Sequence, residues 1–87
     1  MIYRQPAKLI IQLEDANMGQ LIYYWNYYNK PCSLVVQKAK TEGLNAIRLN
    51  MDNADAGSLV WALMERLGAY AYYEETKQPA DMLDLFM

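Results

Sequence analysis

Carboxylate side chains are the main candidates for acid–base chemistry in this 87-residue sequence. There is no histidine, so the commonest general base and the commonest metal ligand at neutral pH are both missing. Cys32 is the single cysteine. Alone it cannot complete a zinc site, and it has no imidazole to activate its thiol. We therefore expect Cys32 to be a small buried residue rather than a nucleophile.

The densest group of oxygen-bearing side chains is the segment 50–55, which contains two Asp and two Asn. A calcium loop needs ligands at alternate positions, a central glycine and a distal glutamate, and this segment lacks that spacing. Such residues fit the start of a helix, where they cap free N–H groups. The four glycines are isolated, so the sequence has no glycine-rich phosphate loop. These features predict a protein that is not an enzyme and that holds neither a cofactor nor a metal ion.

The charge balance argues against a ligand bound mainly by electrostatics. Eight basic and ten acidic residues give a net charge of −2, whereas nucleic-acid binders rely on a basic surface that neutralises phosphates. A single cysteine allows no internal disulfide, which is typical of a reducing compartment. No apolar run has the length of a signal peptide or of a membrane span. We therefore predict a cytoplasmic protein with no membrane partner.

Aromatic residues form the densest binding feature of the sequence. Tyr outnumbers Phe eight to one, and five of the six positions 23–28 are aromatic. Neither a helix nor a strand can turn five such side chains toward one core, so some of Tyr23, Tyr24 and Tyr27 must be exposed. Exposed Tyr side chains are typical anchors of protein interfaces, and we predict these three as protein-binding residues. The alternative is that the whole segment packs against the core and the tail of a small domain.

The C-terminal segment carries a second binding feature. Its residues Met82-Leu83-Asp84-Leu85-Phe86 resemble the peptide by which bacterial proteins dock on the DNA sliding clamp, typically Gln-Leu-(Ser or Asp)-Leu-Phe. The resemblance implies that Leu83, Leu85 and Phe86 fill an apolar pocket of the clamp, while Met82 stands where the family has glutamine. The same residues also resemble a clathrin-box peptide and an acidic-hydrophobic activation segment. In the alternative, the segment is a short amphipathic helix that completes the core.

Hydrophobic periodicity indicates the elements that position these residues. Residues 8–14 alternate as a strand, and a helix of about twelve residues follows and ends near 29–30. The competing interpretation of 20–28 is an aromatic strand. In the helix, the expected apolar face comprises Leu21, Ile22, Trp25 and Tyr28.

Segments 33–40 and 44–51 flank a turn at 41–43 and are expected to pair as a hairpin, although 33–42 could instead be a helix capped by Gly43. The hairpin has an expected core face of Val35, Ala39, Ile47, Leu49 and Met51. Its opposite, solvated face carries Val36, Lys38, Lys40, Arg48 and Asn50. We predict the basic residues of that face (Lys38, Lys40 and Arg48) as the nucleic-acid-binding set.

The second helix is the clearest element. Its start is marked by Asp52, Asn53 and Asp55, its apolar positions follow helical spacing through Leu67, and Gly68 stands at its C-cap. A Tyr-rich strand is expected over 69–75. The order βαββαβ is that of a ferredoxin-like α+β fold, with a four-stranded antiparallel sheet and two helices on one face. We expect one domain over 1–75 and a C-terminal tail, a docking peptide in one interpretation, over 76–87.

Together these features predict a non-catalytic interaction domain that engages a nucleic-acid-processing machine through its aromatic helix, its Leu-Asp-Leu-Phe tail, or both. In the first form of this hypothesis, the chain is a bacterial or phage protein that docks on the sliding clamp in DNA replication. One alternative is a small phage-type inhibitor that blocks a host nucleoprotein enzyme by masking its surface. Another is a single-strand binder that stacks bases on Tyr24, Trp25 and Tyr27 beside the three basic residues. RNA-recognition domains stack bases on their central strands, and here those strands contain no aromatic residue. Contact with nucleic acid is otherwise expected to be indirect, and the sequence is compatible with a homo-oligomer.

Overall fold

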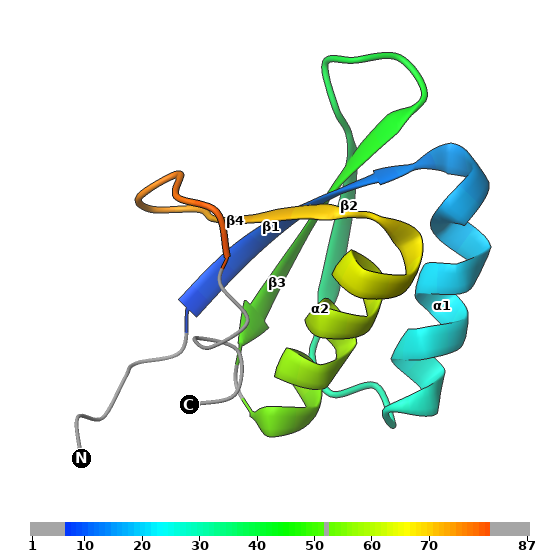
Figure 1. The fold of residues 1–87 in the computed structure, drawn as a ribbon, viewed down its shortest axis with the longest axis vertical. Coiled ribbons are helices and arrows are strands. Elements are labelled where there is room, and N and C mark those ends of the chain that lie inside the picture. Colours follow the sequence, from blue (N-terminus) through cyan, green and yellow to red (C-terminus); the bar gives the residue numbers. More distant parts are fainter. Residues whose placement is uncertain (1–6, 52, 81–87) are drawn as a thin grey trace.

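In the computed structural model, which describes residues 7–51 and 53–80, the elements follow the predicted βαββαβ order (Figure 1). They are β1 Ala7–Glu14, α1 Met18–Tyr27, β2 Leu34–Lys38, β3 Leu44–Met51, α2 Ala54–Leu67 and β4 Tyr70–Tyr73. A 3-10 turn, Asp15–Asn17, joins β1 to α1. The aromatic segment is therefore helical rather than a strand, and the alternative of a helix over 33–42 is wrong because β2 occupies its centre.

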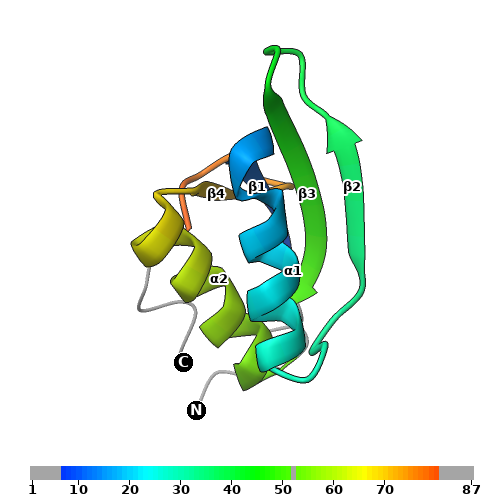
Figure 2. The ribbon, with the colours of Figure 1, turned by 90° about the vertical axis from the view of Figure 1, so that its right-hand side faces the viewer.

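The four strands form one antiparallel sheet in the order β2-β3-β1-β4. Both helices lie on the same face of this sheet, and the other face carries no helix (Figure 2). We call the helix-free side the open face. The strand order is that of a ferredoxin-like arrangement, so the predicted fold class is confirmed.

The hydrophobic core fills the space between the helices and the sheet. In β1, Leu9, Ile11 and Leu13 alternate with polar residues and are fully buried, as period-two patterning requires of a strand with one covered face. They meet apolar residues of β3 and of both helices. The largest fully buried side chains besides these three are Leu21, Ile47, Leu49, Leu59, Val60 and Leu63.

Both ends of α2 are capped as the sequence predicts. The Asn53 side chain accepts a hydrogen bond from the Ala56 N–H at 2.9 Å and donates one to the Pro31 carbonyl, also at 2.9 Å. It therefore fixes the start of α2 and ties that start to the chain that enters β2. At the other end Gly68 adopts φ 66°, a left-handed conformation that glycine reaches without steric penalty.

The predicted faces of the hairpin are confirmed for β3, where Ile47 and Leu49 are buried, but are inverted for β2. Val36 lies opposite Ile47 on the helix-covered side of the sheet, and Val35 lies opposite Arg48 on the open face. The prediction assumed a three-residue loop at 41–43. In the structure Ala39 pairs with Leu44, with the Ala39 N–H 3.0 Å from the Leu44 carbonyl, so the loop has four residues, 40–43. One extra loop residue shifts the register by one and turns every β2 side chain to the other face.

The chain after β4 turns back along the sheet edge. The Tyr73 N–H donates to the Gln78 carbonyl and the Ala80 N–H donates to the Ala71 carbonyl, each at 2.9 Å. Tyr72 and Pro79 form a β-bridge, and Ala80 is buried in the core. The predicted tail, 76–87, is described only as far as Ala80, and there its backbone is bonded to β4.

Candidate protein-binding surface

The buried face of α1 is formed by residues spaced three and four apart. Leu21 is fully buried, and Tyr24, Trp25 and Tyr28 are half-buried against the core. The prediction of Ile22 on this face is wrong, because a 100° step from Leu21 carries its side chain to the flank of the helix, where it is 46% exposed. Tyr24, at the third position after Leu21, takes its place.

The one polar side-chain atom of Trp25 forms a hydrogen bond within the domain. Its indole Nε1 donates a 2.8 Å hydrogen bond to the carbonyl of Cys32, just before β2. The Lys30 N–H donates to the Trp25 carbonyl at 2.8 Å, and the Lys30 ammonium lies 5.5 Å from the centre of the indole ring. Trp25 is therefore a structural residue that fixes the path from α1 to β2. The Cys32 side chain is buried, as the sequence predicts.

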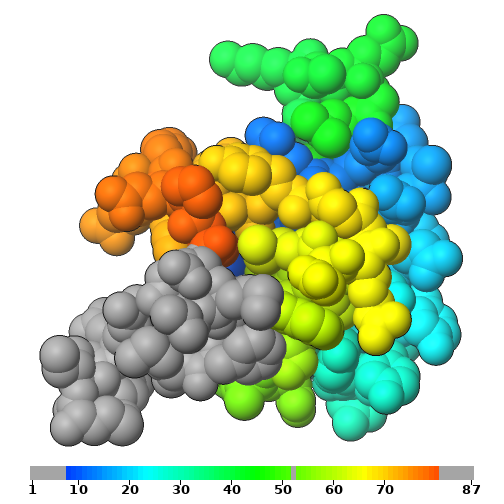
Figure 3. All heavy atoms as spheres, viewed as in Figure 1, coloured from blue at the N-terminus to red at the C-terminus, as the bar shows by residue number. Residues whose placement is uncertain are grey.

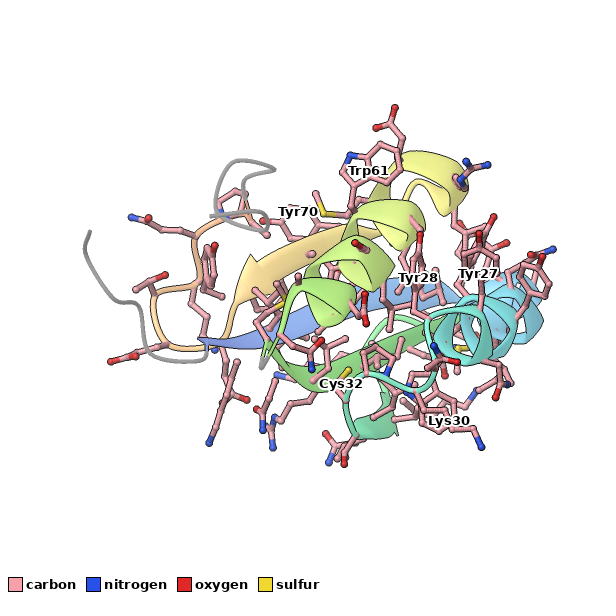
Figure 4. The ribbon with its side chains drawn as sticks, turned by 90° about the horizontal axis from the view of Figure 1, so that it is seen from below. Tyr27, Tyr28, Lys30, Cys32, Trp61 and Tyr70 are labelled. Carbon is pink, nitrogen blue, oxygen red and sulfur yellow. The ribbon has the colours of Figure 1, made fainter. Side chains whose placement is uncertain are left out.

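A row of four tyrosine rings, each in contact with the next, extends from the buried face of α1 to its exposed side. Tyr23 and Tyr27, one turn apart, stack with ring centres 6.4 Å apart. Tyr24 packs edge-on against Tyr23 at 5.2 Å, and Tyr28 packs edge-on against Tyr27 at 5.0 Å. We call these four residues the tyrosine row. Figure 4 shows Tyr27 and Tyr28 projecting from α1 on the side of α2.

The tyrosine row runs from the core to the solvent. Its outer members are the most exposed large apolar side chains that we find in the described residues, with Tyr23 at 60% and Tyr27 at 66%. Its inner members, Tyr24 and Tyr28, pack against the core. Because each outer ring rests on an anchored inner one, the outer rings lose little further freedom when a partner covers them. Such pre-ordered aromatic surface is typical of interface anchors.

The sequence-predicted protein-binding residues therefore occupy two environments. Tyr23 and Tyr27 are exposed over 60% and 66% of their surface, whereas Tyr24 is half-buried and contacts the Tyr23 ring. Leu83, Leu85 and Phe86 lie outside the described residues.

The three basic residues singled out for nucleic acid do not form one surface. Lys38 bonds Asp15 Oδ1 at 3.1 Å. Arg48 is on the open face, where it forms an ion pair with Glu74, whose Oε1 atom is buried. Lys40 is in the β2–β3 loop, which projects from the rest of the molecule at the top of Figure 3. The stacking residues Tyr24, Trp25 and Tyr27 belong to the helix layer and so lie across the sheet from Arg48.

Asp15 is the described residue whose electrostatics depart clearly from the ordinary. The amide of Asn45 donates to its Oδ1 at 2.7 Å, and Lys38 donates to the same oxygen. Both donors stabilise the carboxylate, so the Asn45 hydrogen bond and then the Lys38 interaction hold the pKa of Asp15 below its ordinary value of 3.8. A lowered pKa keeps the carboxylate ionised, which suits a link between the 3-10 turn after β1 and the β2–β3 hairpin rather than proton transfer.

Two shallow hollows lie near Asp15 and its hydrogen bonds. One, of about 370 Å³, is lined by residues 14–16 and 41–44, and a smaller one of about 190 Å³ lies between the end of β1 and the start of β4. They share Glu14 and Leu44. Within residues 7–51 and 53–80, no three His, Cys, Asp or Glu side chains are placed to hold a metal ion.

The open face holds an aromatic pair that the sequence analysis missed. Tyr70 and Tyr72, two positions apart on β4, have ring centres 5.7 Å apart, and the Lys77 ammonium lies 5.9 Å from the centre of the Tyr72 ring. Tyr72 lies opposite Ile10 in the register, and Ile10 is buried although it faces away from the helices. The alternation of 69–75 was the available signal, since positions 70 and 72 must share a face.

No family model matches the chain, and neither a curated protein nor a solved structure matches it. The fold defines it as an α+β protein with ferredoxin-like strand order, an arrangement that supports many unrelated functions. Neither helix in the described residues is long and apolar enough to span a membrane. Function must therefore be argued from the surfaces themselves.

Proposed function

We propose that this protein is a non-catalytic interaction domain that binds another protein through the tyrosine row of α1. One observation carries the proposal: the core formed by the described residues does not include Tyr23 or Tyr27, yet both rings contact neighbouring rings. Two ordered and largely exposed aromatic side chains at adjacent turns offer a partner apolar area together with two phenolic hydroxyls.

We further propose that the partner belongs to a nucleic-acid-processing machine and that the protein works in the cytoplasm. The resemblance of residues 82–86 to a sliding-clamp peptide supports the first point, and the single cysteine supports the second. The tyrosine row and the clamp-like segment are separate in sequence, so the two contributions can be removed independently.

The test compares Tyr23→Ala/Tyr27→Ala with Tyr70→Ala, a matched control that removes a 47% exposed tyrosine from the open face. Proteins retained by the tagged wild-type chain from an extract of the source cells are identified, purified and titrated with each variant by calorimetry. We expect the double variant to lose at least tenfold in affinity, because aromatic anchors concentrate binding energy. We expect Tyr70→Ala to bind like the wild type.

Thermal melts separate binding from folding. The double variant removes only solvent-facing rings, so its unfolding free energy should fall by no more than about 1–2 kcal/mol, mostly from lost ring–ring contacts. A purified partner that binds the double variant as tightly as the wild type would show that the tyrosine row is not the interface.

A further inference from the structure

The two edges of the sheet differ in how their backbone groups are used. At the β4 edge the returning segment bonds the outward groups of Ala71 and Tyr73 and so closes that edge. At the other edge β2 is the outermost strand (Figure 2). Among the described residues, no chain segment pairs with β2 on its outer side. Each chain therefore has one closed edge and one open edge within the part that the structure describes.

The direction of the β2 backbone groups follows from one hydrogen bond. The Ala39 N–H donates to the Leu44 carbonyl at 3.0 Å and so points toward β3. Backbone groups alternate in direction along an antiparallel strand, so those of Val35 and Gln37 also point toward β3. The N–H and C=O groups of Leu34, Val36 and Lys38 must point away from the sheet, and in the described residues no hydrogen bond to these groups is present.

The side chains of β2 favour pairing rather than preventing it. Val35 and Val36 are about half exposed, at 49% and 46%, one on each face of the sheet. Two adjacent β-branched residues are strong strand formers. An edge lysine often discourages pairing, but the ammonium of Lys38 is bonded to Asp15 of its own chain.

We propose that β2 pairs with β2 of a second copy of this chain, antiparallel and centred on Val36. A two-fold axis through Val36 places it opposite its own copy, Leu34 opposite Lys38, and Val35 opposite Gln37. The three outward-pointing residues are symmetric about Val36, so every outward N–H meets an outward C=O, with about six hydrogen bonds in all. Lys38 meets Leu34 of the other copy, so like charges are not opposed.

The number of open edges determines where this assembly stops. A chain with two open edges could continue into a fibre, whereas isologous pairing through a single open edge closes at two copies. The product is one continuous sheet built from two four-stranded sheets. An interface of five residues per strand belongs to the small, weak class, so we expect a dissociation constant on the order of 10–100 µM.

Hydrogen exchange measured residue by residue tests the pairing directly. In sedimentation equilibrium the wild-type chain should pass from monomer to dimer between about 1 µM and 1 mM. Over the same range, the amides of Leu34, Val36 and Lys38 should become protected. The amides of Val35 and Gln37, already bonded to β3, should be protected at every concentration. A chain that stays monomeric throughout overturns the proposal and leaves the edge for a strand of another protein.

Charge substitutions test the register. Val36→Lys and Val36→Glu each place like charges opposite each other at the axis and should weaken the dimer at least tenfold. An equimolar mixture of the two should restore it as a heterodimer. Val35→Lys is the matched control, equally exposed on the same strand but opposite Gln37, and it should weaken the dimer far less. Equal weakening by Val35→Lys, or a mixture that stays monomeric while both variants are folded, refutes the Val36-centred pairing. Tyr23→Ala/Tyr27→Ala should dimerise normally, so the outcome is independent of the proposed partner-binding surface.

Discussion

Leu63→Ala is the sharpest test of how the helix layer is held. Leu63 is fully buried at the centre of α2 and belongs to the main hydrophobic cluster. Its truncation removes buried methyl groups and leaves a cavity, which costs about 2–5 kcal/mol. A domain of 87 residues has roughly 4–13 kcal/mol of total stability, so the variant should be close to unfolding at the lower end.

Ile22→Ala is the matched control, since it shortens an aliphatic helical side chain that is 46% exposed. It should cost no more than about 1 kcal/mol, because less apolar surface leaves water there on folding and the site can relax into solvent. Urea denaturation followed by the fluorescence of Trp25 and Trp61 gives both free energies. A loss below about 1 kcal/mol for Leu63→Ala, or equal losses for both variants, would refute the described packing of the helices.

Four further outcomes are expected. Asn53→Ala should cost about 1 kcal/mol in urea denaturation, whereas Asn53→Asp should keep the cap and lose only the bond to Pro31. The folded pKa of Asp15 is lowered, so its contribution to stability is present above the ordinary value of 3.8 and is lost as pH falls through the folded pKa. Asp15→Asn should therefore lower the urea midpoint at pH 7 and leave it nearly unchanged near pH 2. Single-stranded DNA should bind no tighter than about 1 µM at 150 mM salt in a fluorescence titration. If residues 82–86 dock on the sliding clamp, Leu85→Ala/Phe86→Ala should abolish binding to the purified clamp with little change in melting temperature. A loss of several kcal/mol in unfolding free energy would instead make these residues part of the core.

Sequence patterns were sufficient for the element order because each element has its own local signal. The alternation of 8–14, the apolar spacing of α2 and the cap at Gly68 each follow from the period or the turn chemistry of a few neighbouring residues. These signals agree with one another. The ferredoxin-like order followed from them without knowledge of any long-range contact.

The faces of α1 and β2 could not be settled in the same way. Ile22 is more apolar than Tyr24, yet the helix geometry places Tyr24, three positions after Leu21, against the core and leaves Ile22 46% exposed. In the hairpin, the error was one residue of loop length, and no local feature of 40–43 distinguishes a three-residue loop from a four-residue loop.

The sequence also did not predict that the chain turns back after β4 and pairs with it. Nothing in residues 78–80 indicates that they bond to the strand they have just left, because edge pairing depends on backbone groups that every residue carries. The open edge of β2 could not be predicted from the sequence for the same reason. Its importance follows from the closure of the other edge and from the direction of one N–H group at Ala39.

The two proposed surfaces are geometrically linked. Antiparallel pairing of β2 about a two-fold axis perpendicular to the sheet leaves the covered face of each copy on the same side. Both copies of α1, and with them both tyrosine rows, would then face the same side of the joined sheet. Two rows on a rigid sheet can engage a partner that has two equivalent sites, and the second contact forms at high effective concentration. A weak dimer and a modest single-site affinity would then combine into tight binding to a multimeric partner, while binding to a single-site partner would stay modest. Val36→Lys should therefore weaken binding to a multimeric partner without altering the single-site affinity that the tyrosine row determines.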